Sequence, residues 1–523
     1  MRGIELGGFQ ISGSMQKTIL LVFCIYSIGV VTLGFLVHLK SRKNSKFSDF
    51  LTGGGKLNVI EVAMISAMTS MAGGTMIAGP GLTRTVGFIY TLIALSYAFN
   101  TFFSLGAFGK KTAIIKERIH GRSCIQMLHH RYQSKEVTIV VTLSMVVFLM
   151  ITTGAQFLNA ARIFTMILGN NAYSVGMIIC ILVLILYSTT GGVRSLAKVC
   201  VLQGAFMIFS VLFLIVVTMH RISVDYENVE QAMRGLETIN KTLISANSYT
   251  FMEAISIAIV SGWANALNPS LLQVPMMYDN TKVMKKAAII SCSMAFFIYL
   301  FMTVSGALSY ILNPNLSHAD YATVFLTASL MPDWMAGIVV SAIFAAIQSS
   351  VSSFVLMIAG SLTGDLYVEC FGGKATQKQL KKINNILFIV FCCMCALLAL
   401  NQNQLGQLLV ILSAGGIALT FGIPYFFGVY WKKATAHGAF SSCIIGIISY
   451  VLFYKLSAMQ WYKIYFHHVN ALIPAAVITI LTMIIVSLFT QNKKVPLGVY
   501  RIWFCREYTE KYTNIYNSCD FIK

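Results

Sequence analysis

The segment EVAMISAMTSMAGGTMIAGPGL, residues 61–82, is apolar and long enough to cross a bilayer, yet Gly73–Gly74 interrupts it in the middle. A second segment, EAISIAIVSGWANALNPSLLQV at residues 253–274, is broken around Gly262 and by Asn268–Pro269. Irregular backbone at membrane depth is tolerated only where it is buried in protein or lines a cavity. Matching interruptions in two halves of a chain indicate a transport site near the bilayer midplane. Glycine and proline are also common in membrane helices in general, so a plain packing role stays open.

The composition is that of a membrane protein. The chain has 523 residues, of which 57% are hydrophobic and 11% are charged, whereas a soluble domain carries about 25% charged residues. Apolar segments of about 20 residues, the length that crosses a bilayer, recur along it. Thirteen such segments lie at 17–39, 58–80, 87–108, 137–165, 172–190, 199–219, 251–274, 287–312, 335–364, 384–401, 406–430, 439–457 and 471–490. We therefore predict an all-α polytopic protein with about 13 transmembrane helices.

The basic residues predict the orientation of the chain. The formal net charge is +20, from 38 Lys+Arg against 18 Asp+Glu, which in a soluble protein would favour nucleic-acid binding. Alternate connections between the apolar segments hold 29 basic residues on one side and 9 on the other. Because cytoplasmic loops are enriched in Lys and Arg, we predict an outside N-terminus, a cytoplasmic C-terminal tail at 491–523, a plasma-membrane location and no nucleic-acid partner.

Polar residues gather in one apolar segment, which contains SAIFAAIQSSVSS at residues 341–353. Helical spacing places Ala346, Ser349, Ser350 and Ser353 on one face. Small residues of this kind also let helices pack closely, and spacing alone does not choose between the two roles. Hydroxyl and carbonyl oxygens are the ligands of a small hard cation, and the helix broken at residues 73–74 would supply carbonyls without helical partners.

Several motifs resemble one known family, in the same order along nearly the whole chain. They are MIAGPG (76–81), LGAFGKKTAII (105–115), HHRYQS (129–134), AQFLNAARIF (155–164), LYSTTGGVRS (186–195), AAIQSSVSS (345–353), GDLY (364–367) and GVYWKKATAHGA (428–439). The chain thereby resembles the sodium:solute symporter family, and within it the bacterial sodium/pantothenate symporter (pantothenate permease) branch.

The resemblance implies a leucine-transporter-like fold and sodium-driven solute import by alternating access. Ten core helices would form two inverted five-helix repeats, at 58–219 and 251–430, with one helix before them and two after. The resemblance also places one Na⁺ between the broken helix and the serine helix. Its ligands would be the backbone carbonyls of Met68, Met71 and Ala346 and the hydroxyls of Ser349 and Ser350.

The sequence departs from the family pattern at one position that concerns the number of ions. In GGVRSLAKVCVLQG (191–204), Cys200 stands where the family usually has an aspartate, and Gln203 is kept. Some members use that aspartate with further serines of the serine helix around a second sodium. A neutral thiol is a poor ligand for a hard cation, so Ser352 and Ser353 lack an anionic partner and we predict a single coupling ion. Ser70 likewise replaces an acid that some members have.

The solute is expected between the two broken helices. The candidate residues are Gly73, Gly74, Thr75, Tyr97, Asn100, Gln156, Arg162, Trp263, Asn265, Asn268, Thr420 and Phe421. For each of them ordinary interhelical packing is an equal alternative. Arg162 lies in an apolar segment, where a cation is costly and is by default functional. Because arginine binds a carboxylate through two parallel hydrogen bonds, we predict a small anionic solute, pantothenate-like in class, unless Arg162 instead extends toward the outer membrane surface.

Two other functions stay open. Glu61 and Glu253 are acids near helix ends, and either would carry the proton in a proton-coupled transporter of the same fold. A transporter-derived ligand sensor is disfavoured, because sensors of this type carry long signalling domains after the spans and the tail is short. The sequence contains no nucleophile–base pair, phosphate loop or metal constellation, so an enzyme is not predicted, and it does not indicate an oligomeric state.

Overall fold

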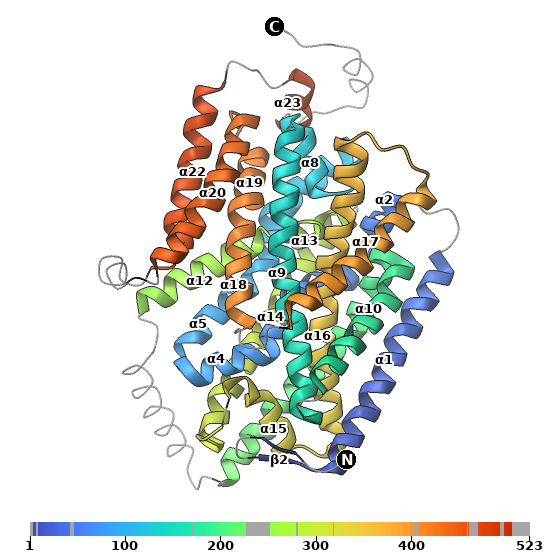
Figure 1. Cartoon of the computed structure of the whole chain (residues 1–523), viewed down its shortest axis with the longest axis vertical. Helices are drawn as coiled ribbons and strands as arrows, with labels where there is room; N and C mark the ends of the chain where they lie inside the picture. Colours follow the sequence, from blue (N-terminus) through green and yellow to red (C-terminus); the bar gives the residue numbers. More distant parts are fainter. Residues whose placement is uncertain are drawn as a thin grey trace.

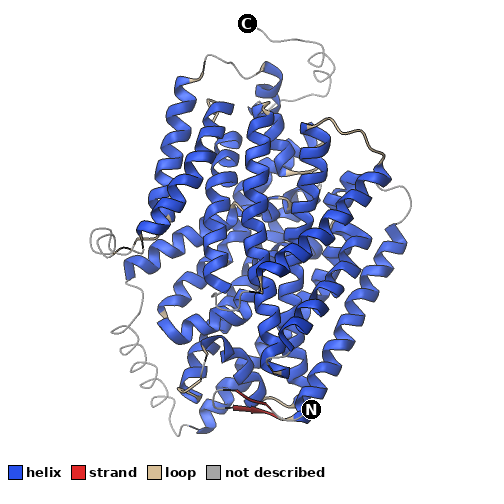
Figure 2. Cartoon of the chain, viewed as in Figure 1, coloured by secondary structure: helices blue, strands red, loops and turns tan. Residues whose placement is uncertain are grey.

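The structure is a computed structural model of the whole chain (Figure 1). It describes residues 4–6, 9–41, 46–169, 172–225, 251–278, 281–316, 318–400, 406–457, 459, 469–491 and 496–504. Within these ranges the regular structure is helical apart from one short antiparallel hairpin near the N-terminus, drawn in red in Figure 2, and an isolated bridge between Lys56 and Tyr278. The predicted all-α class is confirmed.

The elements follow one another as a long series of helices. In chain order they are β1 (Ile4–Leu6), β2 (Phe9–Ile11), α1 (Gly13–Ser41), α2 (Phe47–Thr52), η1 (Gly53–Gly55), α3 (Val59–Ser70), η2 (Gly74–Ala78), α4 (Gly79–Val86), α5 (Ile89–Ser96), α6 (Ala98–Phe102), η3 (Phe103–Phe108), α7 (Gly109–Ile119), α8 (Cys124–Tyr132), α9 (Lys135–Leu168), α10 (Tyr173–Asp225), α12 (Phe251–Ala266), α13 (Pro269–Leu272), η5 (Val274–Met277), α14 (Thr281–Leu312), η6 (Ala319–Tyr321), α15 (Ala322–Leu330), α16 (Asp333–Gly360), η7 (Ser361–Cys370), α17 (Gln377–Leu398), α18 (Gly406–Ile417), η8 (Ala418–Gly422), α19 (Ile423–Tyr430), α20 (Ala436–Leu456), α22 (Leu472–Phe489) and α23 (Leu497–Phe504).

The helices that are long and apolar enough to cross a membrane agree with the predicted segments. Among the described residues there are 10 such helices, or up to 12 if each bent pair counts as one span. A shorter apolar helix, Tyr173–Thr189, covers the fifth predicted segment. Every predicted segment overlaps one of these elements, while the exact count of thirteen spans stays a prediction.

The serine helix α16 lies in the centre of the bundle. It packs against α10, α1, α9 and α3. Of its most apolar 18-residue stretch, 89% is buried inside the protein. α1 is a peripheral helix, since only 28% of its most apolar 18-residue stretch is buried. Leu21, Ile25 and Ile28 are exposed on it. In a membrane such apolar exposure faces lipid, so α16 is a core helix and α1 an outer one (Figure 1).

Both interrupted segments bend where the sequence predicts. The helix pair Val59–Ser70 and Gly74–Val86 bends by 60°, and the pair Glu253–Ala266 and Pro269–Met277 bends by 47°. At the first break a Cβ on Gly73 would lie 2.5 Å from the Ile347 side chain of α16. Only glycine therefore allows the broken helix to approach α16 this closely. At the second break the Asn268 side chain accepts a hydrogen bond from the Ser270 N–H at 3.0 Å and caps the new helix.

Candidate ion and solute site

Four oxygen atoms converge where the break in α3 meets α16. The Ser349 hydroxyl lies 3.3 Å from the Met68 carbonyl and 3.0 Å from the Ala346 carbonyl. The Ser350 hydroxyl lies 3.0 Å and 3.1 Å from the same two carbonyls. All four residues are completely buried. We call these four oxygens the oxygen cradle.

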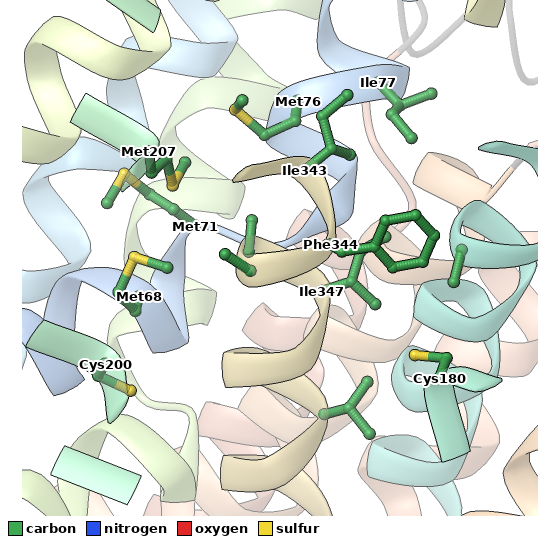
Figure 3. Packing of buried hydrophobic residues seen from close by; sticks show 14 of the residues in the cluster. Met68, Met71, Met76, Ile77, Cys180, Cys200, Met207, Ile343, Phe344 and Ile347 are labelled. Atoms are coloured by element: carbon green, nitrogen blue, oxygen red, sulfur yellow. The ribbon is translucent and has the colours of Figure 1, made fainter. Parts of the chain in front are cut away.

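The cradle exists because α3 ends inside the bundle. The last backbone bond of α3 runs from the Met71 N–H to the Ala67 carbonyl, so the Met68 carbonyl is beyond the helical ladder and turns to α16. The side chains of Met68 and Met71 lie in the apolar cluster with Cys200 and Met207 of α10, as Figure 3 shows. Met71 adopts extended backbone angles at the break, and its carbonyl, the fifth expected ligand, stays a prediction.

The cradle has the chemistry of an alkali-cation site. Each serine hydroxyl has one proton but lies close to two carbonyls, so its hydrogen bond is shared between them. The lone pairs of both hydroxyl oxygens stay available to a cation. A cation among the four oxygens would be coordinated by lone pairs from all of them at once. The donors are hard, neutral oxygens, which suit Na⁺. The described residues contain no group of three or more His, Cys, Asp or Glu that could hold a metal ion.

The other serine pair of α16 is already engaged. Ser352 Oγ lies 2.5 Å from the Tyr187 hydroxyl and accepts a hydrogen bond from Ser188 at 3.0 Å, and it also donates to the Gln348 carbonyl at 2.8 Å. Ser353 Oγ lies 2.9 Å from Thr69 Oγ1. Ser352 is thus bonded to side-chain hydroxyls of α10, whereas the bonds of Ser349 and Ser350 run to backbone carbonyls.

A cavity with several polar side chains in its lining adjoins the cradle on the side of the broken helices. It is lined by Thr69, Ser70, Ala72, Gly74, Thr75, Gly79, Tyr90, Ala94, Tyr97, Asn100, Thr152, Gln156, Asn265, Asn268, Leu271, Tyr299, Thr303, Phe354, Val410 and Ala414. We call it the solute cavity. Seven of the predicted solute residues line it: Gly74, Thr75, Tyr97, Asn100, Gln156, Asn265 and Asn268. The structure thus brings together residues from both halves of the chain.

Two amides present unsatisfied groups in this cavity. Gln156 Oε1 accepts a hydrogen bond from the Gly73 N–H at 2.8 Å, which fixes the amide so that Nε2 is the remaining donor. Gln156 Nε2 and Asn100 Oδ1 are both buried and have no hydrogen-bond partner in the described part of the chain. Buried polar groups are normally paired, so one donor and one acceptor are available to a solute.

The structure places the other predicted solute residues elsewhere. Gly73 is at the break and faces α16 and Gln156. Trp263 packs against Phe426 with ring centroids 6.4 Å apart. Thr420 bonds to the Gly416 carbonyl at 2.9 Å, and Phe421 stacks on Tyr425. None of these four lines the solute cavity.

Arg162 also lies outside the cavity lining, in an ion pair. Its Nη1 lies 2.8 Å from Asp320 Oδ2, and the two side chains are 18% and 17% exposed. Burial raises the pKa of Asp320, while the Arg162 guanidinium acts to lower it. Asp320 lies beside Gly81, where a Cβ would be 2.9 Å from Oδ1. The pair therefore joins the end of α9 to the loop before α15, against the MIAGPG motif.

Sequence reasoning missed one wall of the cavity. Tyr299 and Thr303 of α14 line it; the Tyr299 ring stacks on Tyr97 at 5.7 Å and its hydroxyl donates to the Ser70 carbonyl at 3.0 Å. They are one helical turn apart in a long apolar segment. That spacing predicts that both residues lie on one face of the helix, but it does not identify the part of the protein that this face contacts.

The C-terminal end of α16, where it continues into η7, is hydrogen-bonded to the loop between α7 and α8. The Ser123 hydroxyl lies 2.6 Å from Asp365 Oδ1. Arg122 Nη2 donates to the Gly364 carbonyl at 2.6 Å and forms an ion pair with Glu369 at 2.8 Å. These contacts join the two halves of the chain at the end of the bundle where α8 lies.

The acids considered for proton coupling are not in the solute cavity. Glu61 is part of a capping box: its carboxylate accepts from the Asn58 N–H at 3.0 Å and its own N–H donates to Asn58. Glu253 lies in the first turn of α12. Neither residue lines the cavity.

Comparison with known proteins gives a consistent result. The model of the sodium:solute symporter family matches residues 50–446. The sodium/pantothenate symporter of Haemophilus influenzae is 25% identical over 449 residues, which cover 84% of this chain and 91% of that protein. The sodium/proline symporter of Escherichia coli is 24% identical over 473 residues, covering 86% and 90%.

Solved structures of low sequence identity show the same fold. A Na⁺-coupled sialic acid symporter in a substrate-bound outward-open state superposes with a TM-score of 0.72 at 17% identity, covering 90% of this chain and 98% of that one. Mhp1, a nucleobase–cation symporter, gives a TM-score of 0.53 at 14% identity, covering 90% and 99%. The predicted leucine-transporter-like fold class is confirmed.

Proposed function

This chain belongs to the sodium:solute symporter family, and we propose that it imports a small organic carboxylate, driven by one Na⁺ per cycle held in the oxygen cradle. Family members are secondary transporters rather than enzymes, and the chain is a multi-pass protein of the plasma membrane. The proposal adds the position and number of the ion and the chemical class of the solute.

One observation carries the proposal. The Met68 carbonyl, freed by the break in α3, lies within 3.3 Å of the hydroxyls of both Ser349 and Ser350. Met68 in α3 and Ser349 in α16 are 281 residues apart in sequence. A cation between them would hold the broken helix against α16, so ion binding and helix position would be coupled.

The coupling to solute follows from adjacency. Thr69 and Ser70, which directly follow the cradle residue Met68, line the solute cavity. An ion bound at the cradle thus fixes backbone that the solute touches. Its positive charge would also attract a carboxylate in an environment of low dielectric constant. Na⁺ and a carboxylate together carry no net charge, which reduces the cost of moving them across the membrane core.

The solute class rests on the cavity groups. Gln156 Nε2 offers a hydrogen-bond donor to a carboxylate oxygen, and Asn100 Oδ1 offers an acceptor to a hydroxyl or amide N–H. Relatives named for pantothenate and proline take solutes that carry a carboxylate. Arg162 stays a predicted anion anchor only for a conformation in which it leaves Asp320.

A single ion is favoured by the partners of Ser352. Tyr187 and Ser188 saturate this hydroxyl, and Cys200, which takes the place of an acid, is buried among apolar side chains. Among the residues that the structure describes, no anionic group is found there to offset the charge of a second cation.

The orientation and the repeat boundaries complete the proposal. The basic loops support a cytoplasmic position for α8 and α23 and an outside position for the N-terminus. The two bent pairs support the division into inverted repeats at 58–219 and 251–430.

Uptake into proteoliposomes tests the function. An inward Na⁺ gradient should drive accumulation of a radiolabelled carboxylate, with pantothenate and proline as the first probes, and replacement of Na⁺ by choline should abolish it. Accumulation that follows a pH gradient in choline, and that is lost in Glu61→Gln or Glu253→Gln, would replace the proposal by proton coupling.

A further inference from the structure

A second cavity, of about 580 Å³, lies at the end of the bundle that carries the basic loops. It is formed where α8 passes into α9 and where α19 passes into α20, beside the end of α22. It shares no lining residue with the solute cavity. Its size falls in the range of about 300–1,000 Å³ that is typical of small-molecule sites.

Two helices begin at this cavity. Ser134 is the N-cap of α9, which has 34 residues, and Thr435 is the N-cap of α20, which has 21. Both N-caps line the cavity. The first turn of a helix has backbone N–H groups without intrahelical partners and a partial positive charge. Two such ends directed at one cavity favour an anion.

Arg131 adds a buried charge to the same cavity. The residue is 1% exposed. Its Nε donates to the Gly428 carbonyl at 2.9 Å, and Nη2 donates to carbonyls of the loop after α19, including Ala434 at 3.2 Å. In the described part of the chain Nη1 has no hydrogen-bond partner, and no acidic side chain forms an ion pair with Arg131. The Nη1 atom is itself closed off from solvent, and the rings of Tyr132 and Phe504 lie against the guanidinium. Arg131 therefore acts on the cavity through its buried positive charge, which favours a negatively charged occupant.

The charges around the cavity are mostly positive. Lys135, Lys432 and Lys433 are exposed on the two loops that form it, and His437 lines it in the first turn of α20. The one acid in its lining is Glu136, whose carboxylate accepts from the Ser134 hydroxyl at 2.7 Å. A bound anion would therefore meet several attractive groups and one repulsive group.

We propose that this cavity binds the phosphate of an anionic phospholipid from the cytoplasmic leaflet. Phe440 lines the cavity and is 38% exposed, which gives the polar site an apolar side. α20 and α22, which flank it, are outer helices (Figure 1), because only 33% and 28% of their most apolar 18-residue stretches are buried. A free phosphate would use only the polar end, whereas a lipid would also place its acyl chains along α20. Basic sites at helix ends on this leaflet suit anionic headgroups.

The test uses the purified full-length protein and counts retained lipid by native mass spectrometry. The probes are phosphatidylglycerol, phosphatidylcholine and potassium phosphate, the last chosen so that no Na⁺ is added. Arg131 is left unchanged, because its loss would release the end of α19. The variants are His437→Glu and Glu136→Gln, with Glu117→Gln as control, since Glu117 is exposed on α7 and does not line the cavity.

The expected result is one phosphatidylglycerol per chain, retained more strongly than phosphatidylcholine. Removing the like charge in Glu136→Gln should tighten retention about threefold to tenfold, and His437→Glu should weaken it by about tenfold. Glu117→Gln should match the unchanged protein. Equal retention of the two lipids, or pocket variants that behave as the control does, would overturn the site. If potassium phosphate competes fully and the variants change its binding in the same order, the lipid assignment is wrong and the occupant is a free phosphate.

Discussion

Two serine pairs on α16 are only three residues apart and have different surroundings. Ser349 and Ser350 face the Met68 carbonyl, which the break in α3 leaves without a helical partner. Ser352 faces Tyr187 and Ser188, which satisfy it completely. The residues are chemically the same, so under the proposed function the neighbouring group, a backbone carbonyl for Ser349 and Ser350 and side-chain hydroxyls for Ser352, decides which of them holds a cation. The interrupted helix supplies a backbone carbonyl that can coordinate a cation, whereas Tyr187 supplies a hydroxyl that is hydrogen-bonded to Ser352.

Removing the cradle hydroxyls should give the largest effect. The double variant Ser349→Ala/Ser350→Ala leaves the Met68 carbonyl without its two hydroxyl partners and removes two proposed cation ligands. Apparent Na⁺ affinity should fall by roughly 100-fold, or about 3 kcal/mol, and Na⁺-stimulated uptake should be lost. Uptake that keeps its normal Na⁺ dependence would show that the two serine pairs do not differ as proposed.

The solute cavity should respond separately from the cradle. Gln156→Glu keeps the acceptor for the Gly73 N–H but replaces the donor by a negative charge. The apparent affinity for a carboxylate solute should fall by about tenfold or more through lost hydrogen bonding and repulsion. Concentration dependence of uptake measures this effect, and Gln156→Ala is the uncharged control. If both variants bind the solute normally, Gln156 is a structural residue.

A matched pair of variants decides the role of Arg162. Arg162→Ala and Asp320→Ala each break one side of the same partly buried ion pair, so each should destabilise the protein by about 1–3 kcal/mol and leave apparent solute affinity within about twofold. Thermal unfolding and uptake measure the two effects. A loss of affinity in Arg162→Ala that Asp320→Ala does not share would restore Arg162 as the anion anchor.

The smallest effect is expected at the engaged serine. Ser352→Ala removes a satisfied hydrogen bond, which should reduce stability by about 1 kcal/mol and change apparent Na⁺ affinity by less than about twofold. The Na⁺ dependence of uptake, measured beside the cradle variant, checks this. A large loss of Na⁺ affinity in Ser352→Ala would indicate that the second pair also holds an ion.

The parts of the site that local sequence specifies were predictable. Gly73–Gly74 predicts the break, helical spacing predicts the face of Ala346, Ser349 and Ser350, and the structure brings these to the Met68 carbonyl. Partners that are far apart in sequence were predicted only where the family resemblance supplied them, as for Met68 and Ser349. Asp320 is 158 residues from Arg162, and Tyr187 is 165 residues from Ser352; no local pattern connects them.

The solute cavity shows the same limit. Residues at the breaks or on polar stretches, such as Asn100 and Asn268, were identified from sequence because their chemistry is unusual for an apolar segment. Tyr299 and Thr303 were missed, since a tyrosine and a threonine one turn apart fit equally well against lipid headgroups, a neighbouring helix or a cavity. Only the packing of α14 against α3 decides among these.

Equilibrium binding of radioactive Na⁺ to the purified protein most directly tests the claim that a kinked backbone and two serines form the ion site. We predict one saturable Na⁺ per chain, which disappears in Ser349→Ala/Ser350→Ala and persists in Ser352→Ala. A stoichiometry of two, or saturable binding that survives the double substitution, would contradict the account.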